Sequence, residues 1–266
     1  MNDVPTIVEI ARVGRVVSKG CQSLLVTSTQ IISRRDLSTL ARRLVAADLD
    51  LRPFYRVASR HPVLGAIVTS LKGLKPLPPP SLFEMAVIAI TEQQLSMTAA
   101  FQIRSRLIKR FGTLVDDLHV FPTSERLVHV PLRDLKTCGL SRRKAEYLKG
   151  VASRIASGEL DLEALSQKTD VEAAAVLVRE RGFGDWSAQY FLGRGLGRTD
   201  SLPSADVGLR RAIGKYLARG QHLSPSGLDR VLAPFTPFRG LAAFYVAAYA
   251  RLSSLPRAKW SSPEYG

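Results

Sequence analysis

Cysteine is scarce in this sequence, with only Cys21 and Cys138 among 266 residues. Two cysteines cannot supply the four ligands of an iron–sulfur cluster or a zinc ribbon, and they fit a reducing compartment better than a disulfide-stabilised fold. The four histidines are scattered and do not have the spacing of metal ligands. We therefore expect no metal site built from side chains.

Long apolar runs are also missing. No stretch reaches the roughly 20 residues that a membrane helix needs, and the N-terminus lacks the basic start and apolar core of a signal peptide. We expect a soluble, intracellular, monomeric protein without a membrane partner. The glycine-rich segment 193–197 lacks the G-x-G-x-x-G spacing of dinucleotide-binding proteins, and we find neither a Walker A motif nor a G-x-S-x-G elbow. These absences argue against nucleotide-binding and serine-hydrolase classes.

Acidic residues are strongly outnumbered. The chain has 38 Lys and Arg against 23 Asp and Glu, which gives a formal net charge of +15. Such an excess indicates a polyanionic partner. An apolar content of 45% over 266 residues is enough for a sizeable core in one large domain or two small ones.

The apolar pattern changes once along the chain. Residues 5–17 and 23–32 are rich in Val, Ile and Thr and predict two or more strands. From Arg35 onward the spacing is helical, including a helix over 83–90 that resumes at 97–111 and a closing helix over 228–251. Prolines in the segment 72–80 cannot continue a helix and predict a rigid connector between lobes. The fold class is thus mainly α with a small N-terminal β-containing region.

A glycine turn stands out within the helical part. Gly182 and Gly184 flank Phe183 between the apolar segment 173–178 and a second helical run that contains Trp186 and Tyr190. The spacing predicts a helix, a tight hairpin and a helix. Glycines allow positive φ and close approach, and the unpaired N–H groups of the second helix can hold a phosphate. A plain helix corner with a glycine cap is the alternative.

Asp206 precedes another helical run, and its carboxylate oxygens can serve either of two roles. Aspartate at this place is a good N-cap. A carboxylate at a helix start facing a cleft can also stabilise a developing cation, because a fixed charge is worth more in a dry site than in water.

Two polar segments suit contact with a nucleic acid. In Glu92-Gln93-Gln94-Leu95, glutamine can bond exposed base edges and leucine can fill the gap left by an extruded base, whereas a polar helix cap is the alternative. Farther on, Ser141 can cap a helix and leave its N–H groups near a phosphate. We expect phosphate contacts from the basic residues that follow it, although they can also form a solvated helix face: Arg142, Arg143 and Lys144.

Together these segments resemble the helix-hairpin-helix DNA glycosylase superfamily, specifically its alkylbase branch, the DNA-3-methyladenine glycosylase II type. The resemblance covers roughly residues 40–255, and four segments carry it in order: Ile90-Thr-Glu-Gln-Gln-Leu-Ser96, Cys138-Gly-Leu-Ser-Arg-Arg-Lys-Ala145, Gly182-Phe-Gly-Asp-Trp-Ser-Ala188 with Leu202-Pro-Ser-Ala-Asp206, and Pro237-Phe-Arg239-Gly-Leu-Ala242. It implies a two-lobed fold. We place a β-containing region at 1–36, a helical segment packing with the C-terminal lobe at 37–80, the hairpin lobe at 81–203 and the C-terminal lobe with the catalytic Asp at 204–266.

The resemblance implies a base-excision repair enzyme that flips an alkylated purine, such as 3-methyladenine or 7-methylguanine, out of duplex DNA and hydrolyses its N-glycosidic bond. Asp206 would stabilise the oxocarbenium-like transition state. Other roles follow for sets of residues. The base pocket would use Trp186 and Tyr190, with Phe244 or Tyr245 opposite, although core packing is the alternative for these aromatics; the wedge would be Gln94 or Leu95; the hairpin grip would come from Arg181, Gly182, Phe183 and Gly184. No cofactor is implied, except that hairpin carbonyls can hold a monovalent cation.

One position distinguishes between members of the family, and two others differ from the family's usual residues. Trp186 stands where bifunctional members have a lysine that forms a Schiff base, and tryptophan cannot form one. We therefore expect a monofunctional glycosylase that leaves an abasic site. Arg181 replaces a usual proline and can strengthen phosphate binding, and Glu92 replaces a common glycine. Both changes leave the lesion spectrum open.

Two other functions remain possible from the residues alone. The same fold can act on a neutral lesion such as uracil, hypoxanthine or an oxidised purine, but such a leaving group needs a hydrogen-bond donor or acid at the base, and none is evident. A non-catalytic helix-hairpin-helix DNA-binding protein would also carry the basic charge and the hairpin. Asp206 argues against it, because an acidic group aimed at DNA weakens binding.

Overall fold

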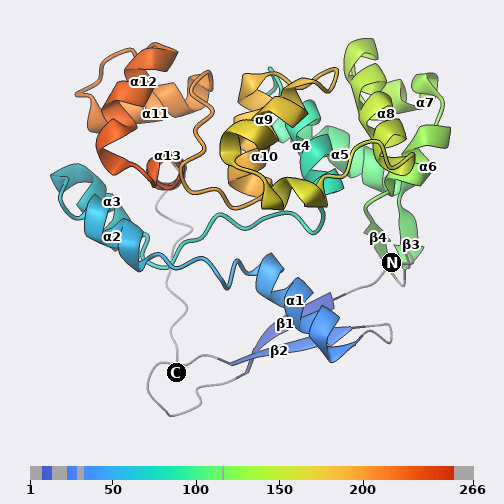
Figure 1. Cartoon of the computed structure of the whole chain (residues 1–266), viewed down its shortest axis with the longest axis horizontal. Coiled ribbons are helices and arrows are strands. Elements are labelled where there is room, and N and C mark those ends of the chain that lie inside the picture. Colours follow the sequence, from blue (N-terminus) through green and yellow to red (C-terminus); the bar gives the residue numbers. More distant parts are fainter. Residues whose placement is uncertain (1–7, 14–22, 29–32, 116, 255–266) are drawn as a thin grey trace. The chain divides into compact units, whose positions relative to one another are not determined.

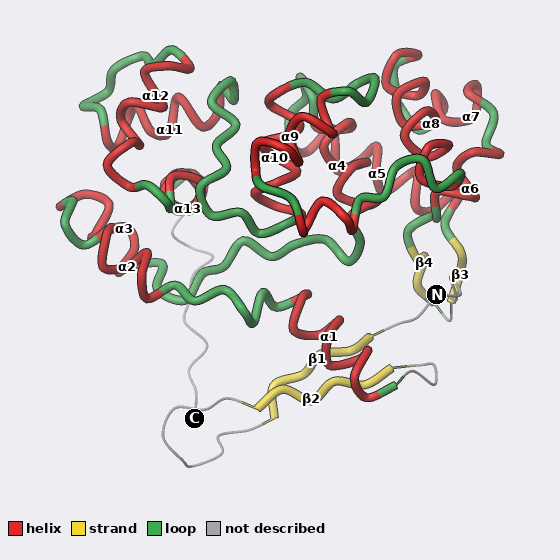
Figure 2. Tube along the Cα trace, viewed as in Figure 1, coloured by secondary structure: helices red, strands yellow, loops and turns green. Residues whose placement is uncertain are grey.

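The computed structural model describes residues 8–13, 23–28, 33–115 and 117–254. Helices dominate this part of the chain, and the strands form two short antiparallel hairpins (Figure 2). The expected mainly α fold with a small N-terminal β region is therefore confirmed. The chain divides into two compact units, which are described separately: a first unit of residues Met1–Leu49 and Leu77–Gly197, and a second unit of residues Asp50–Pro76 and Arg198–Gly266.

The first unit holds both hairpins and most of the helices (Figure 1). Its elements in chain order are β1 (Val8–Val13), β2 (Ser23–Ser28), α1 (Arg34–Leu44), α4 (Leu82–Glu92), α5 (Met97–Phe111), β3 (Thr113–Val115), β4 (Leu118–Val120), α6 (Ser124–His129), α7 (Leu132–Thr137), α8 (Arg142–Ala156), the 3-10 helix η1 (Glu163–Gln167), α9 (Asp170–Val178) and α10 (Asp185–Gly195). In the first hairpin, Val8 pairs with Ser28 and Val13 with Ser23.

Helix α4 is the central helix of the first unit and packs against α5, α8 and α10. It starts after Ser81, whose hydroxyl accepts a hydrogen bond from the Glu84 N–H. Apolar residues line almost all of its circumference, which is the pattern of a helix buried on every side. Its buried residues are Leu82, Met85, Ala86, Val87, Ala89, Ile90 and Thr91.

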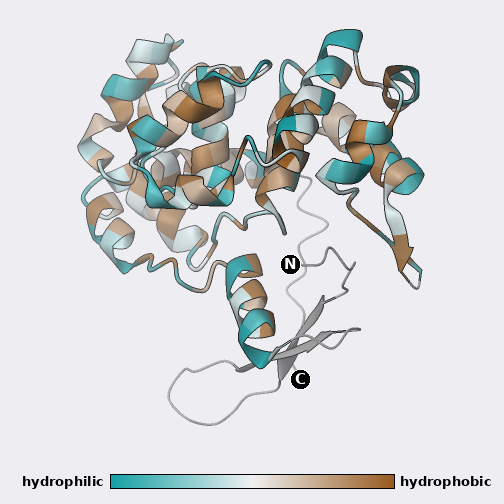
Figure 3. Ribbon diagram, turned by 45° about the vertical axis from the view of Figure 1, so that its right-hand side comes forward, coloured by the Kyte–Doolittle hydropathy of each residue, from teal (hydrophilic) through white to brown (hydrophobic). Residues whose placement is uncertain are grey.

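The other long helices of the first unit are amphipathic, with hydrophobic and hydrophilic residues interleaved along the same ribbon (Figure 3). Helix α8 buries Leu148 against α6 and α7 and Val151 against the cluster around α4. One helix thus joins the two hydrophobic clusters of this unit. Because α8 and α4 are packed together, the residues at the start of α8 lie beside the end of α4.

The second unit is built around its last helix. Its elements are α2 (Arg52–Ala58), α3 (Pro62–Ser70), α11 (Val207–Leu217), α12 (Pro225–Leu232), the 3-10 helix η2 (Ala233–Phe235) and α13 (Arg239–Ser253). Helix α13 packs against α3, α11 and α12. The Tyr245 ring lies 5.1 Å from that of Phe54, and its hydroxyl donates to the Leu74 carbonyl oxygen at 2.6 Å. This contact attaches residues 50–76 to the C-terminal helices.

Three details differ from the sequence-based expectations. The β3–β4 hairpin lies inside the part expected to be all-helical, because strands of three residues are too short to show an alternating pattern. The closing helix expected over 228–251 is broken into α12, η2 and α13, since Pro234 and Pro237 cannot continue it. Helix α1 belongs to the first unit, so the segment that packs with the C-terminal helices is 50–76 and not all of 37–80.

A prediction concerns Glu84 in the first turn of α4. Burial raises the pKa of its carboxyl from 4.5 to about 7, and the attraction of Arg104 offsets part of this. The folded protein then keeps a proton that the unfolded chain releases, so the free energy of unfolding falls as pH rises from 4.5 to about 7. We expect a fall of the order of 1–3 kcal/mol, allowing for partial exposure. Glu84→Gln should remove most of this fall, which is measured as the difference in the free energy of unfolding in urea between pH 5 and pH 8. An equal difference in wild type and variant would contradict the prediction.

Candidate functional site

The hairpin between α9 and α10, residues 179–184, has a geometry that requires glycine at one position. Gly182 has φ +102°, and a Cβ added there would lie 2.4 Å from Cγ of Tyr147 on α8. Gly184 adopts φ −107°, and an added Cβ would meet nothing within 4 Å. It is the N-cap of α10 and offers no capping side chain. The predicted helix-hairpin-helix is confirmed, and the first N–H groups of α10 are suited to an anion.

Phe183 anchors this hairpin in the core. Its side chain is only 6% exposed, and its ring meets that of Phe191 edge-on with centroids 6.4 Å apart. The prediction that Phe183 contacts DNA is therefore wrong for its side chain. An aromatic residue between two glycines holds the turn against the protein while the glycines bring the backbone to the surface.

The loop 93–96 is tied to the hairpin by Gln93. Its Nε2 donates to the carbonyl oxygen of Gly182 at 2.6 Å and to Oγ of Ser187 at 2.8 Å. Gln94, the next residue, has a left-handed φ of +53°, and Leu95 is 42% exposed. The two residues predicted as the wedge are thus presented on the surface by a loop that is fixed at its first residue.

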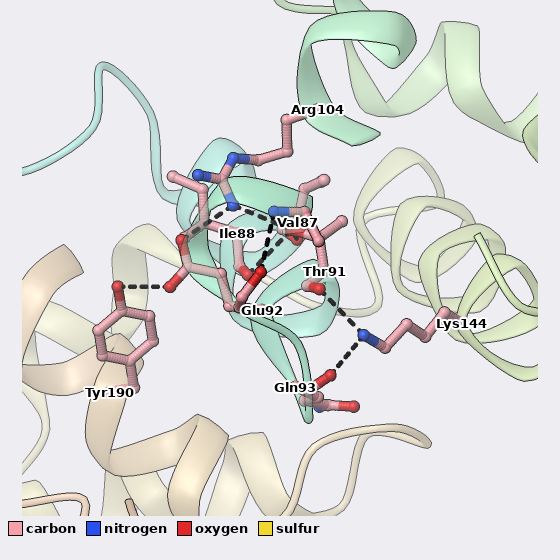
Figure 4. Close-up of polar contacts among 10 residues, drawn as sticks. Val87, Ile88, Thr91, Glu92, Gln93, Arg104, Lys144 and Tyr190 are labelled. Atoms are coloured by element: carbon pink, nitrogen blue, oxygen red, sulfur yellow. Dashed lines mark hydrogen bonds and ion pairs between the residues drawn. The ribbon is translucent and has the colours of Figure 1, made fainter. Parts of the chain in front are cut away.

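Lys144 holds the same loop from the other side. Its Nζ donates to the carbonyl oxygens of Thr91 at 2.9 Å and Gln93 at 2.6 Å (Figure 4). Burial lowers the pKa of its ammonium group. The ammonium is directed at the end of α4, which differs from the expected phosphate contact. Ser141 accepts from the Lys144 N–H at 3.3 Å, so its predicted role as a helix cap is confirmed.

The other basic residues near the hairpin are more exposed and gather around two side chains of α8. Nε of Arg142 lies 3.0 Å from Oε1 of Glu146, and Nη2 of Arg143 donates to the Tyr147 hydroxyl at 3.0 Å. Arg181 reaches the same pair, with its guanidinium 5.8 Å from the centre of the Tyr147 ring. These three arginines place positive charge beside both the start of α8 and the hairpin.

Trp186 and Tyr190, one turn apart on α10, form a stacked pair with ring centroids 5.1 Å apart and planes at 26°. Both side chains are half-buried. The Tyr190 hydroxyl donates to Oε2 of Glu92 at 2.8 Å, and Nη1 of Arg104 donates to Oε1 at 2.9 Å (Figure 4). Burial and the nearby Glu92 carboxylate raise the pKa of the Tyr190 hydroxyl, so it remains a donor at neutral pH.

In the second unit, Asp206 is the N-cap of α11. Its Oδ1 accepts from the Leu209 N–H at 2.8 Å, and its side chain is half-buried. The segment before it is held by Arg239, which forms a two-oxygen ion pair with Asp200, the shortest contact being 2.6 Å. The expected cap is confirmed, and the carboxylate has a fixed orientation.

The two aromatic residues predicted for the other side of the base pocket have different environments. Tyr245 is fully buried and bonded to Leu74 and Tyr55, so it is a core residue and the prediction is wrong. Phe244 is half-buried, with its ring 6.0 Å from that of Tyr245. Adjacent residues of a helix face different directions, but helical spacing alone does not tell which of the two faces the core.

A basic cavity of about 380 Å³ lies along α11 and includes Val207, the residue that follows Asp206, in its lining. Its charged lining comes from Arg210, Arg211 and Lys215, and no acidic side chain lines it.

In the described part of the chain, no cluster of three or more His, Cys, Asp or Glu side chains has the arrangement of a metal site. Over the same residues, no single helix is long and apolar enough to span a bilayer; only a pair bent by 107°, Pro225–Phe235 with Arg239–Ser253, passes by length and composition.

Sequence reasoning missed three residues that shape the candidate site. Gln93 was passed over for its neighbours, Tyr147 was not considered, and Glu92 was noted only as a departure from a glycine. The run Glu92-Gln93-Gln94 at the end of an apolar helix was a usable signal, because polar side chains that remain partly buried there need hydrogen-bond partners.

The hairpin 179–184 opens helix α10 and lies near the turn that Ser141 caps and near exposed arginines. This combination is typical of a helix-hairpin-helix protein that holds a nucleic acid backbone. The family described as the HhH-GPD superfamily base excision DNA repair protein matches residues 87–232, more than half of the chain. The chain belongs to this superfamily.

Individual relatives narrow the comparison. A DNA-3-methyladenine glycosylase of Bacillus subtilis is 31% identical over 206 residues, which cover 75% of this chain and 67% of that protein. DNA-3-methyladenine glycosylase 2 of Escherichia coli is 27% identical over 187 residues, covering 69% of this chain and 63% of that protein. The solved 3-methyladenine DNA-glycosylase of Archaeoglobus fulgidus superposes with a TM-score of 0.78 at 27% identity, covering 94% of this chain and 84% of that one. The matched segments thus span about two thirds of the two bacterial relatives.

The hairpin glycines allow a matched test. Gly182→Ala should destabilise the fold by about 2 kcal/mol or more, because it adds strain at positive φ and a clash with Tyr147. It should also weaken DNA binding by displacing the turn. Gly184→Ala, with a backbone any residue adopts and open space at Cβ, should change stability by less than about 1 kcal/mol. Urea unfolding and fluorescence anisotropy with labelled duplex DNA check both; equal losses in the two variants would contradict the assignment.

Proposed function

We propose that the protein is a monomeric DNA glycosylase that removes alkylated purines such as 3-methyladenine and 7-methylguanine from duplex DNA inside the cell. The observation that carries this proposal is the set of site residues on a glycosylase fold: a stacked Trp186–Tyr190 pair beside the hairpin, and Asp206 oriented at a helix start. The names of its relatives support the same substrate class.

The first unit has the parts needed to hold DNA with one base extruded. The hairpin and the start of α8 offer N–H groups and arginines to backbone phosphates, and Gln94 or Leu95 fills the gap in the stack. An alkylated purine is cationic, so it stacks favourably on the electron-rich faces of Trp186 and Tyr190. The Gly182 carbonyl already accepts from Gln93. A monovalent cation at the hairpin would use backbone carbonyls of residues 179–184.

Asp206 performs the electrostatic part of the reaction. As the bond between the base nitrogen and C1′ breaks, its electron pair leaves with the cationic base and positive charge develops on the sugar. The carboxylate stabilises this charge while water adds to C1′ and loses a proton. The cap bond from the Leu209 N–H uses Oδ1 without removing the negative charge, so capping and catalysis are compatible. Trp186 provides no amine, and the product is an abasic site with an intact strand.

Asp206→Asn separates the two roles of this residue. Asparagine caps a helix about as well as aspartate, so the fold of α11 should be retained. Loss of the charge should slow base release by at least about 100-fold. Chromatography of bases released from methylated duplex DNA, with single-turnover rates, checks this.

The controls are the stability of the same variant, which should match that of wild type, and its DNA affinity, which should be at least as high because a negative charge has been removed. Wild type should also give no borohydride-trapped complex. Release of only hypoxanthine or uracil by wild type would move the assignment to a neutral lesion, and tight DNA binding without any base release would indicate a binding protein.

A further inference from the structure

Glu92 is a charged residue almost wholly inside the first unit. Its side chain is 12% exposed and that of its partner Arg104 is 14% exposed. It is the last residue of α4, while Arg104 lies on α5 and Tyr190 on α10 (Figure 4). A carboxylate removed from water is costly unless its oxygens are hydrogen-bonded, and here each oxygen has a donor within 2.9 Å.

The two oxygens of the Glu92 carboxylate have different partners: Arg104 bonds one and Tyr190 bonds the other. Arg104 also donates to the Thr91 hydroxyl at 3.3 Å, which holds the guanidinium on the side of α4 and α5. The other oxygen faces α10 and receives the Tyr190 hydroxyl at 2.8 Å. Glu92 therefore holds the hydroxyl end of Tyr190 in place, and the Tyr190 ring stacks on Trp186 with ring centroids 5.1 Å apart.

A phenol that donates to a carboxylate differs electronically from one that donates to water. The negative acceptor draws the O–H proton toward itself and leaves more electron density on the ring. A ring with a more negative face attracts a cation more strongly, and the effect is larger where water is excluded. Half-burial of Tyr190 and near-complete burial of Glu92 meet that condition.

We propose that Glu92 is a positioning residue that makes the Trp186–Tyr190 wall selective for positively charged purines over neutral ones of the same shape. It acts through Tyr190 and does not itself contact the base. The inference rests on the proposed function, since it names the substrate class of the same wall. It also gives this chain's departure from glycine at position 92 a chemical role.

The test compares 7-methylguanosine, a cation, with guanosine, its neutral counterpart. The sequence has two tryptophans, so Trp260→Phe leaves Trp186 alone to report stacking by fluorescence quenching. In this background, Glu92→Gln removes the charge at nearly constant shape, and Tyr190→Phe removes the hydrogen bond while leaving the Glu92–Arg104 pair intact. Each variant should lower the preference for the cation by about 3- to 30-fold. The double variant should lower it no further, because both changes break one interaction.

The outcomes separate this inference from the proposed function. Equal weakening of both nucleosides in Glu92→Gln would show a merely structural role and overturn the inference, as would unchanged preference in a folded variant or absence of quenching in wild type. If Glu92→Gln unfolds, Tyr190→Phe decides alone. Base release from methylated DNA by wild type tests the proposed function independently, because it does not depend on the preference ratio.

Discussion

The end of α4 is the point on which the functional surface of the first unit depends. A helix leaves its last carbonyl groups without partners, and here the chain turns into an exposed loop immediately afterwards. The ammonium of Lys144 bonds the carbonyl oxygens of Thr91 and Gln93 and so closes this end. A cation is also favoured there by the helix dipole. With the backbone fixed, Gln93 and Glu92 are directed to the hairpin and to the aromatic pair.

In this protein of net charge +15, some basic side chains bond groups inside the first unit and others remain at its surface. Lys144 and Arg104 are bonded inside the first unit, whereas Arg142, Arg143 and Arg181 remain more exposed. Burial opposes the charged form of Lys144 and lowers its pKa, and the two carbonyl bonds offset that penalty. The exposed arginines, whose partners Glu146 and Tyr147 lie on the same surface, are suited to the sequence-independent attraction of phosphates.

Sequence patterns predicted well what depends on local chemistry. The glycine turn at 182–184 and the caps Ser141 and Asp206 follow from rules that act within four residues, and the structure has all three. Patterns failed where a side chain's direction depends on distant neighbours. Phe183 was predicted to contact DNA because it lies in the hairpin, and Tyr245 to line the base pocket because it is aromatic, but both side chains are buried in the core, Tyr245 against residues far away in sequence. Gln93 and Gln94 have the same chemistry, and only the backbone at the end of α4 distinguishes them.

The helix cap at Asp206 suits the catalytic role that we propose for its carboxylate. A free aspartate side chain samples several rotamers, and each reorientation during the reaction would cost part of the stabilisation of the developing cation. The Leu209 N–H selects one orientation through Oδ1, and the Arg239–Asp200 pair holds the segment leading into it. The negative charge persists because a hydrogen bond does not neutralise it. For the role that we propose, local rules of helix capping therefore supply the preorganisation that electrostatic stabilisation of the developing cation requires.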